Sequence, residues 1–195
     1  KASENKTKKL NPKNVLMVCS LKEYKGINQF VQLAEDNSHF DFQLVMNAPQ
    51  EDIDLYFKTF QLPENLKMYA TQTDLHPFYQ WADIILNLSK PDGWVETFGL
   101  TIIEGMSYAL PAIVPPVGGI TEVVADGKNG LHIDCRKTDE LNKALNHILQ
   151  NKEIYLSMSS HSLEMIQNFS EKTFIQKNLQ ILHETVISMR YEEAI

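Results

Sequence analysis

The feature that most constrains the fold of this chain is a regular alternation of strand-like and helix-like segments. Strand-like runs occupy residues 15–18, 42–46, 66–69, 83–88, 112–114 and 131–133. Helical patterns lie between them at residues 27–34, 50–61, 75–81 and 98–109. This alternation predicts an α/β fold, a Rossmann-like parallel sheet flanked by helices. Ligands of such sheets bind at the carboxyl ends of the strands.

The chain becomes all-helical after residue 137. One apolar stripe is formed by Leu141, Ala144, Leu145, Ile148 and Leu149. A final helix is expected after Ser170, a good N-cap, with an apolar seam at Ile175, Leu179, Leu182, Val186 and Met189. We therefore expect a polar linker at residues 1–12, one Rossmann-like domain at 13–170, and a C-terminal helix and tail at 171–195. The start at Lys1 within polar residues suggests a domain cut from a longer protein.

Composition excludes several classes of function. The 18 basic and 25 acidic residues leave a net charge of −7, which disfavours nucleic acid and anionic membranes as partners. Cys19 and Cys135 have no metal-ligand spacing and are expected to be buried free thiols, and the six histidines are scattered. Asp52-Ile53-Asp54 resembles a metal-binding motif, but it falls early in a predicted helix, so we expect no metal site. No signal peptide or membrane-spanning run is visible, which predicts a cytoplasmic protein.

The segment Glu96-Thr97-Phe98-Gly99-Leu100 carries the clearest chemistry. Thr97 can cap a helix that begins at Phe98, so the backbone amides of Phe98, Gly99 and Leu100 would form a phosphate site at the helix start. Glu104, two turns later, would lie about 10 Å along the helix. Glu96 and Glu104 would place a carboxylate near each of the two hydroxylated rings of a nucleotide sugar, with amides for the diphosphate between them. Two exposed acidic residues without a ligand would give the same sequence pattern.

Two further segments follow predicted strands. Lys25-Gly26 stands at a helix start, where the lysine can reach a phosphate as a point charge. Gly118-Gly119 follows the strand at 112–114 and permits close backbone approach. A solvent lysine and a tight turn remain the alternatives for these two segments.

Together these segments resemble the C-terminal domain of the retaining GT-B-fold family called glycosyl transferases group 1. The resemblance covers about residues 14–170. It rests on Lys25-Gly26, Glu96 to Leu100, Glu104-Gly105-Met106, Pro111, Gly118-Gly119-Ile120, Glu122-Val123-Val124, Asp126-Gly127 and Gly130. Several of these motifs occur in the expected order, which makes the resemblance specific.

The resemblance implies a role for each site residue. Lys25 and the amides of Phe98 to Leu100 would hold the diphosphate of a UDP- or GDP-linked sugar, and Glu96 would bind the sugar near the reacting carbon. Glu104 would bind the ribose, and the backbone around Ala70 and Thr71 would meet the base. Glu96 and Lys25 would be catalytic, with no further cofactor required. A missing N-terminal domain would bind the acceptor glycan or lipid-linked glycan, which leaves peripheral membrane association of the full-length protein open.

One departure from the family concerns the diphosphate. The family commonly has an arginine where this chain has Ser20, so either Lys22 or Lys90 compensates or donor affinity is weak. Two other functions stay open: a sugar-nucleotide epimerase with the same cradle, and a non-catalytic α/β module similar to a flavodoxin-like receiver. The receiver needs acidic residues after the first strand, where this chain has Cys19 to Lys22.

Overall fold

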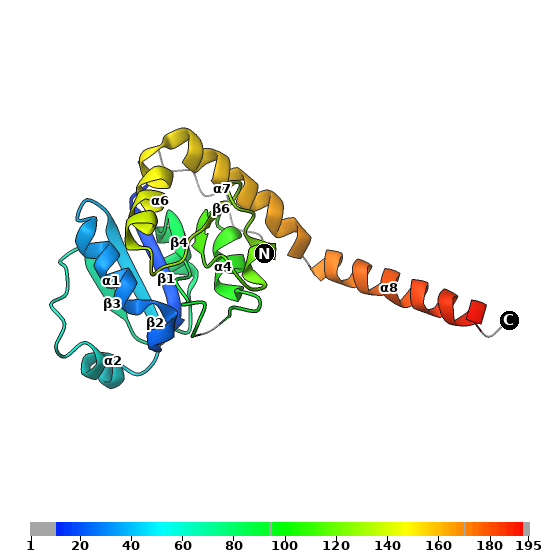
Figure 1. The fold of residues 1–195 in the computed structure, drawn as a ribbon, viewed down its shortest axis with the longest axis horizontal. Helices are drawn as coiled ribbons and strands as arrows, with labels where there is room; N and C mark the ends of the chain where they lie inside the picture. Colours follow the sequence, from blue (N-terminus) through cyan, green and yellow to red (C-terminus); the bar gives the residue numbers. More distant parts are fainter. Residues whose placement is uncertain (1–10, 94, 170, 193–195) are drawn as a thin grey trace.

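The computed structural model describes residues 11–93, 95–169 and 171–192 (Figure 1). Within this part of the chain, parallel strands form one open sheet in the order β3-β2-β1-β4-β5-β6. Their bounds are β1 Asn14–Ser20, β2 Asp41–Asn47, β3 Leu66–Tyr69, β4 Ile84–Leu86, β5 Ala112–Val114 and β6 Gly130–His132. Every predicted strand is present, so the Rossmann-like parallel sheet is confirmed.

The strand order decides between two open α/β topologies. It reverses direction between β1 and β4, which places a topological switch point at the carboxyl ends of these two strands. A flavodoxin-like receiver has the order 2-1-3-4-5 instead. The sheet therefore has the doubly wound order of dinucleotide-binding folds, which speaks against the receiver.

The helices cover both faces of the sheet (Figure 1). Their bounds are α1 Ile27–Asp36, α2 Gln50–Tyr56, α3 His76–Trp81, α4 Leu100–Met106, α5 Ile120–Val123, α6 Thr138–Gln150, α7 Lys152–Ile166 and α8 Glu171–Glu192, with short 3-10 turns η1 Glu23–Lys25 and η2 Gln167–Phe169. The α2 helix is shorter than predicted: the rings of Phe57 and Phe60 pack edge to face just after it, 5.1 Å apart. The α4 helix is also shorter, and Ala109 beyond it has a left-handed φ of 61°.

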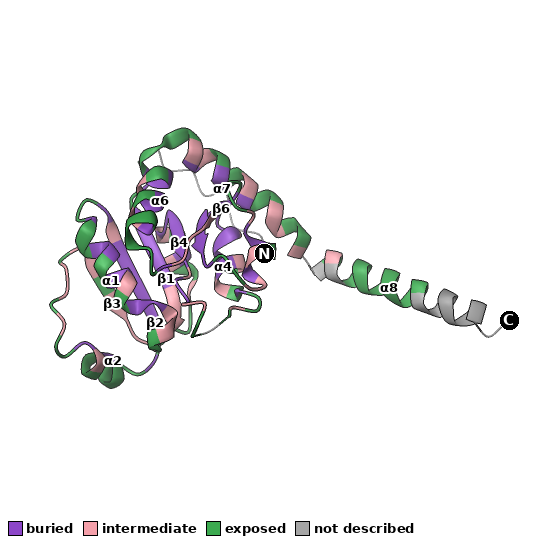
Figure 2. Cartoon of the chain, viewed as in Figure 1, coloured by how far each residue is buried: buried purple, intermediate pink, exposed green. Residues whose placement is uncertain are grey.

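Successive side chains of a strand point alternately into two hydrophobic cores, one on each face of the sheet. Val15 and Met17 of β1 face the core that holds α1 and α6, whereas Leu16 faces the core that holds Tyr79 of α3 and Ile102 of α4. These side chains are buried on both sides of the sheet (Figure 2). This explains why the strands read as continuous apolar runs rather than as alternating ones.

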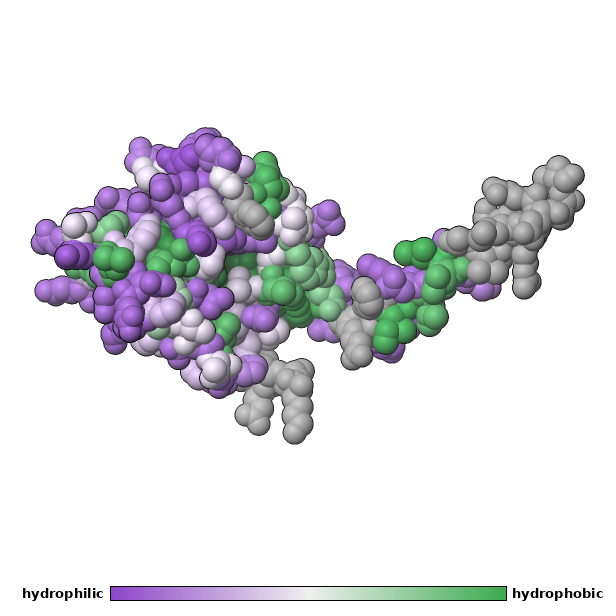
Figure 3. Space-filling view, turned by 90° about the horizontal axis from the view of Figure 1, so that it is seen from below, coloured by the Kyte–Doolittle hydropathy of each residue, from purple (hydrophilic) through white to green (hydrophobic). Residues whose placement is uncertain are grey.

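Helix α8 extends away from the sheet and its flanking helices (Figure 1). Of the predicted seam, Ile175, Leu179 and Leu182 are 48%, 60% and 60% exposed. Hydrophobic residues on this helix are visible in green in Figure 3. The side chains of Val186 and Met189, and the predicted cap Ser170, lie outside the described residues. Among the helices described, none has the length and apolar character needed to cross a membrane.

Candidate functional site

A cavity of about 440 Å³ opens at the topological switch point. Its walls come from the end of β1, from η1, from the end of β4 and from the segment that leads into α4. The cavity therefore lies where open α/β sheets bind their ligands. Among the described residues, Lys25 is the one basic side chain that lines it.

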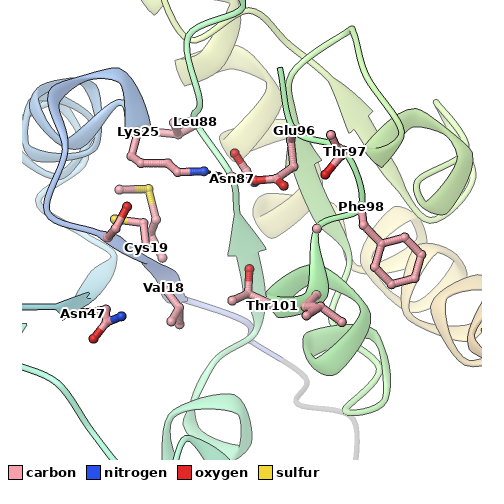
Figure 4. A pocket seen from close by; sticks show the side chains of 14 residues that line it. Val18, Cys19, Lys25, Asn47, Asn87, Leu88, Glu96, Thr97, Phe98 and Thr101 are labelled. Carbon is pink, nitrogen blue, oxygen red and sulfur yellow. Dashed lines mark hydrogen bonds and ion pairs between the residues drawn. The ribbon is translucent and has the colours of Figure 1, made fainter. Parts of the chain in front are cut away.

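Lys25 and Glu96, which are 71 residues apart in sequence, form an ion pair in this cavity (Figure 4). The Lys25 Nζ lies 3.1 Å from the Glu96 Oε2, and the two side chains are only 15% and 17% exposed. Asn87, just beyond β4, donates its Nδ2 to the same oxygen at 3.4 Å. The family resemblance assigned Lys25 to the diphosphate and Glu96 to the donor sugar, and the pairing of these two side chains was not predicted.

The charge state of Glu96 follows from these partners. Burial alone would raise the pKa of the Glu96 carboxyl. The hydrogen bond and positive charge of Lys25, with smaller contributions from Asn87 and the backbone N–H of Phe98, lower this pKa below its ordinary value of 4.5. The site therefore holds an ionised carboxylate beside an ammonium group, suited to hydroxyls and a phosphate respectively.

Asn87 was missed as a site residue because the predicted strand ran through it to residue 88. The strand ends at Leu86, so Asn87 stands at the carboxyl edge with its amide in the cavity. A polar residue that directly follows the buried run Ile84–Leu86 was the signal that could have found it.

The start of α4 differs from the prediction. Gly99 is the N-cap, with a left-handed φ of 77°, and the helix begins at Leu100. The prediction that Thr97 caps a helix from Phe98 is therefore wrong. The chain turns into the helix at Gly99 instead, because glycine adopts a left-handed φ without steric cost. The backbone N–H of Phe98 donates to Glu96 instead of remaining available for a phosphate. The first-turn amides of α4 are those of Leu100 and Thr101, and both residues line the cavity.

Because the helix begins at Leu100, the expected separation of about 10 Å along the helix between Thr97 and Glu104 does not apply. The ring of Phe98 points away from Lys25 and Glu96 (Figure 4) and meets Phe169 edge to face at 6.1 Å. Its side chain is 47% exposed at the rim of the cavity.

Gly118 and Gly119 support the loop that carries Glu96. A Cβ atom would lie 2.3 Å from the Glu96 carbonyl oxygen at position 118, and 1.9 Å from the Thr97 carbonyl oxygen at position 119. The close backbone approach expected at these glycines is therefore present, and the approaching backbone is that of the loop. Neither glycine lines the cavity.

Glu104 lies in a second cavity of about 310 Å³ beside α3 and α4. The hydroxyl of Tyr79 donates to its Oε2 at 2.5 Å. A hollow of about 280 Å³ lies between the two cavities, since it shares Val18 and Asn47 with the first and Gln72 and Leu75 with the second. The two glutamates thus stand at opposite ends of one row of hollows along the carboxyl edge of the sheet.

The loop after β3 borders the middle hollow through Thr71 and Gln72. The Thr71 N–H is engaged with the Ala48 carbonyl at 3.1 Å, and its hydroxyl lies 3.2 Å from the Asn47 Oδ1. Ala70 does not line this hollow but packs, partly buried, against the core. Asn47, at the end of β2, was not singled out from the sequence.

The two residues expected to compensate for Ser20 lie outside the first cavity. The Lys90 Nζ pairs with Glu23 at 3.3 Å. Lys22 is exposed and lines a neighbouring hollow together with Ser20. Neither lysine lines the cavity that holds Lys25.

The remaining residues that drew attention in the sequence have other surroundings. Cys19 borders the cavity, but burial raises the pKa of its thiol to about 12, so it is protonated at neutral pH. Both cysteines are free thiols, as predicted, but only Cys135 is fully buried, whereas Cys19 is partly exposed. Asp54 on α2 accepts a hydrogen bond from Gln50. Among the described residues no group of three or more histidine, cysteine or acidic side chains could hold a metal ion.

The model of the family called glycosyl transferases group 1 matches residues 1–180. The chain belongs to this family. It is 24% identical over 180 residues to an uncharacterized glycosyltransferase of Haemophilus influenzae, covering 89% of this chain and 50% of that protein. It is 41% identical over 94 residues to the alpha-monoglucosyldiacylglycerol synthase of Acholeplasma laidlawii, covering 48% of this chain and 22% of that protein.

Solved structures of glycosyltransferases share the fold of this domain. The HepE protein of Anabaena, in complex with UDP, superposes with a TM-score of 0.77 at 20% identity, over 89% of this chain and 49% of that one. A glycosyltransferase of Rickettsia africae gives 0.75 at 22% identity, over 90% and 48%. The glycosyltransferase domain therefore has half of a GT-B architecture, and it spans about half the length of these relatives.

Proposed function

We propose that this domain binds the donor of a retaining glycosyltransferase, a sugar linked to UDP or GDP. The row of hollows that ends in Glu96 and Lys25 on one side and in Glu104 on the other carries the proposal. A nucleotide sugar has a hydroxylated ring at each end of a diphosphate, and this row offers a carboxylate at each end and a cation near one of them. Solved relatives of the same fold contain UDP or UDP-glucose, which supports a uridine donor.

Each end of the row has a distinct role in this proposal. Lys25 and the amides of Leu100 and Thr101 hold the diphosphate. Glu96 accepts hydrogen bonds from the sugar hydroxyls, and Glu104 accepts them from the ribose. Thr71 and the adjoining backbone border the base, in the hollow between the two cavities.

The chemical step in this proposal is carried by leaving-group stabilisation. As the bond between the anomeric carbon and the diphosphate oxygen breaks, negative charge grows on the diphosphate. Lys25 and the first-turn residues of α4 border the cavity in which that charge would develop, so their donors can stabilise it with little reorganisation. The acceptor hydroxyl then attacks the oxocarbenium-like sugar from the same face and passes its proton to an oxygen of the departing diphosphate, so the configuration is retained.

The acceptor, a glycan or lipid-linked glycan, belongs in this proposal to another domain of the full-length protein. The isolated chain is expected to bind the nucleotide but to give no detectable transfer. Losing the positioning of an acceptor costs on the order of 7–11 kcal/mol of barrier lowering. Robust sugar transfer by the isolated chain, assayed with a panel of donors and acceptors, would contradict the half-enzyme proposal.

Calorimetric titration of the chain with UDP, GDP, ADP and their sugar conjugates tests donor binding directly. Binding of a nucleoside diphosphate, stronger than binding of the nucleoside, is the expected result. Absence of binding for every nucleotide would refute the proposal. An assay of the full-length parent for transfer or for epimerisation of the bound sugar separates a transferase from an epimerase.

A further inference from the structure

The Glu104 side chain is on the exposed side of α4, but a hydrogen bond from a buried residue of α3 restrains the orientation of its carboxylate. Tyr79 of α3 is only 3% exposed and donates its hydroxyl to the Glu104 Oε2 at 2.5 Å. Burial, and then the hydrogen bond and negative charge of Glu104, raise the pKa of Tyr79, so the phenol keeps its proton and remains a donor. An exposed acid is thus fixed by a buried hydroxyl.

Tyr79 is itself held in place by its neighbours. Its ring stacks on that of Tyr108, with centroids 5.5 Å apart and an interplanar angle of 27°. The Tyr108 hydroxyl in turn contacts the His76 Nδ1 at the start of α3. The His76 backbone N–H is bonded to the Asp74 side chain at 2.9 Å, which anchors the first turn of that helix. The hydroxyl that meets Glu104 therefore projects from a packed support.

A fixed carboxylate has a specific use in a cavity that accepts a ribose. A carboxylate offers about four acceptor positions, and the tyrosine occupies one of them, so two neighbouring hydroxyls can still be accepted. A glutamate without this restraint would lose rotamer freedom each time a ligand bound. The restraint therefore favours a ligand that presents a vicinal diol.

We propose that Tyr79 is a positioning residue, whose hydroxyl holds Glu104 in the orientation that reads the 2′,3′-diol of the donor ribose. The inference rests on the proposed function, since it concerns the same donor site. Its consequence is that the discrimination of this site between ribonucleoside and 2′-deoxyribonucleoside diphosphates depends on the Tyr79 hydroxyl.

The test compares UDP with 2′-deoxy-UDP by calorimetry on the same chain. The wild type is expected to prefer UDP by about tenfold or more, because loss of one hydrogen bond to a charged group has at least that effect. Tyr79→Phe is expected to weaken UDP more than 2′-deoxy-UDP, which keeps only the 3′-hydroxyl contact, so the ratio falls towards one. In a Glu104→Ala background the same change should have no further effect on UDP.

Tyr155→Phe is the matched control. Tyr155 is 2% exposed and lies in the core on the opposite face of the sheet from Tyr79. Its variant should keep the wild-type ratio of UDP to 2′-deoxy-UDP. If Tyr79→Phe lowers the Tm below the assay temperature, Tyr79→p-fluorophenylalanine retains the volume of the hydroxyl without its proton.

Two results overturn the inference. One is an unchanged ratio of UDP to 2′-deoxy-UDP in the Tyr79 variants, and an equal loss for both nucleotides would then indicate a structural role alone. The other is a wild type that binds UDP but does not distinguish it from 2′-deoxy-UDP. Failure of the wild type to bind any nucleotide is a different result, because it refutes the proposed function itself.

Discussion

Replacing Lys25 by methionine removes the ammonium group at the first cavity but keeps most of the side-chain volume. In the folded protein this group lies 3.1 Å from the Glu96 carboxylate, and both side chains are more than four-fifths shielded from solvent. The variant therefore has two effects. A bound diphosphate loses its cation, and Glu96 becomes an unpaired carboxylate that faces the same diphosphate.

The size of the effect follows from these two terms. A charge-assisted hydrogen bond contributes about 1.5–3 kcal/mol, which corresponds to roughly 10- to 150-fold in affinity. Repulsion from unpaired Glu96 adds to the loss, so we expect UDP affinity to fall by about 100-fold. Uridine lacks the diphosphate and should lose no more than about twofold. The unpaired, largely buried carboxylate should also lower the free energy of unfolding by about 1–3 kcal/mol.

Calorimetry with UDP, UMP and uridine measures the affinities, after thermal unfolding has shown that the variant is folded at the assay temperature. The double variant Lys25→Met/Glu96→Gln should recover about tenfold in UDP affinity, because the repulsion is removed while the cation is still missing. Lys22→Met and Lys90→Met are matched controls outside the cavity, and each should change UDP affinity by less than about threefold.

Equal losses for UDP and uridine in Lys25→Met would refute the diphosphate role. A double variant that binds UDP no better than the single one would refute the electrostatic reasoning about Glu96. A large loss in Lys22→Met would show instead that a second cation reaches the diphosphate in solution and compensates for Ser20.

Three other predictions follow from the same site. Glu104→Ala should weaken UDP by about tenfold through the lost ribose contact, whereas Glu96→Ala should change UDP less than threefold but reduce transfer by the full-length enzyme; similar UDP losses in calorimetry would contradict the two-ended alignment. Because the pKa of Glu96 is lowered in the folded state, its ionised form stabilises the protein at pH values above the ordinary pKa of 4.5, and this contribution is lost as the pH falls through the folded-state pKa. Plots of Tm against pH for the wild type and Glu96→Gln should therefore converge in acid, and parallel plots would refute the linkage. Gly119→Ala should lower the Tm and weaken donor-sugar binding, since its Cβ would lie 1.9 Å from the Thr97 carbonyl oxygen, whereas Gly127→Ala meets no atom within 4 Å and should affect stability only; weakened donor binding in both variants would indicate a general loss of folding.

Much of the fold was determined by local sequence patterns. The strand from Asn14 to Ser20 is apolar because it is buried on both faces, and the helix from Ile27 to Asp36 has helical periodicity because it covers one of them. Such patterns are visible along the chain because a strand buried on both faces appears as one apolar run, whereas the burial of a helix repeats about every 3.6 residues. The order of the motifs around Lys25, Glu96 and Glu104 also identified the family, which the match over residues 1–180 confirms.

Contacts across the sheet were decided only by the tertiary structure. Lys25 and Glu96 pair because the strand order places β1 beside β4, although 71 residues separate them in sequence. Tyr79 meets Glu104 because α3 and α4 pack on the same face. The backbone at Gly99 likewise depends on close packing, since a Cβ there would lie 2.8 Å from the Ile120 Cδ1. The sequence alone determined which elements form, because that depends on periodic burial and backbone preference within a few residues. Which side chains contact one another depends on how whole helices and strands pack, and this packing cannot be predicted from a local sequence pattern.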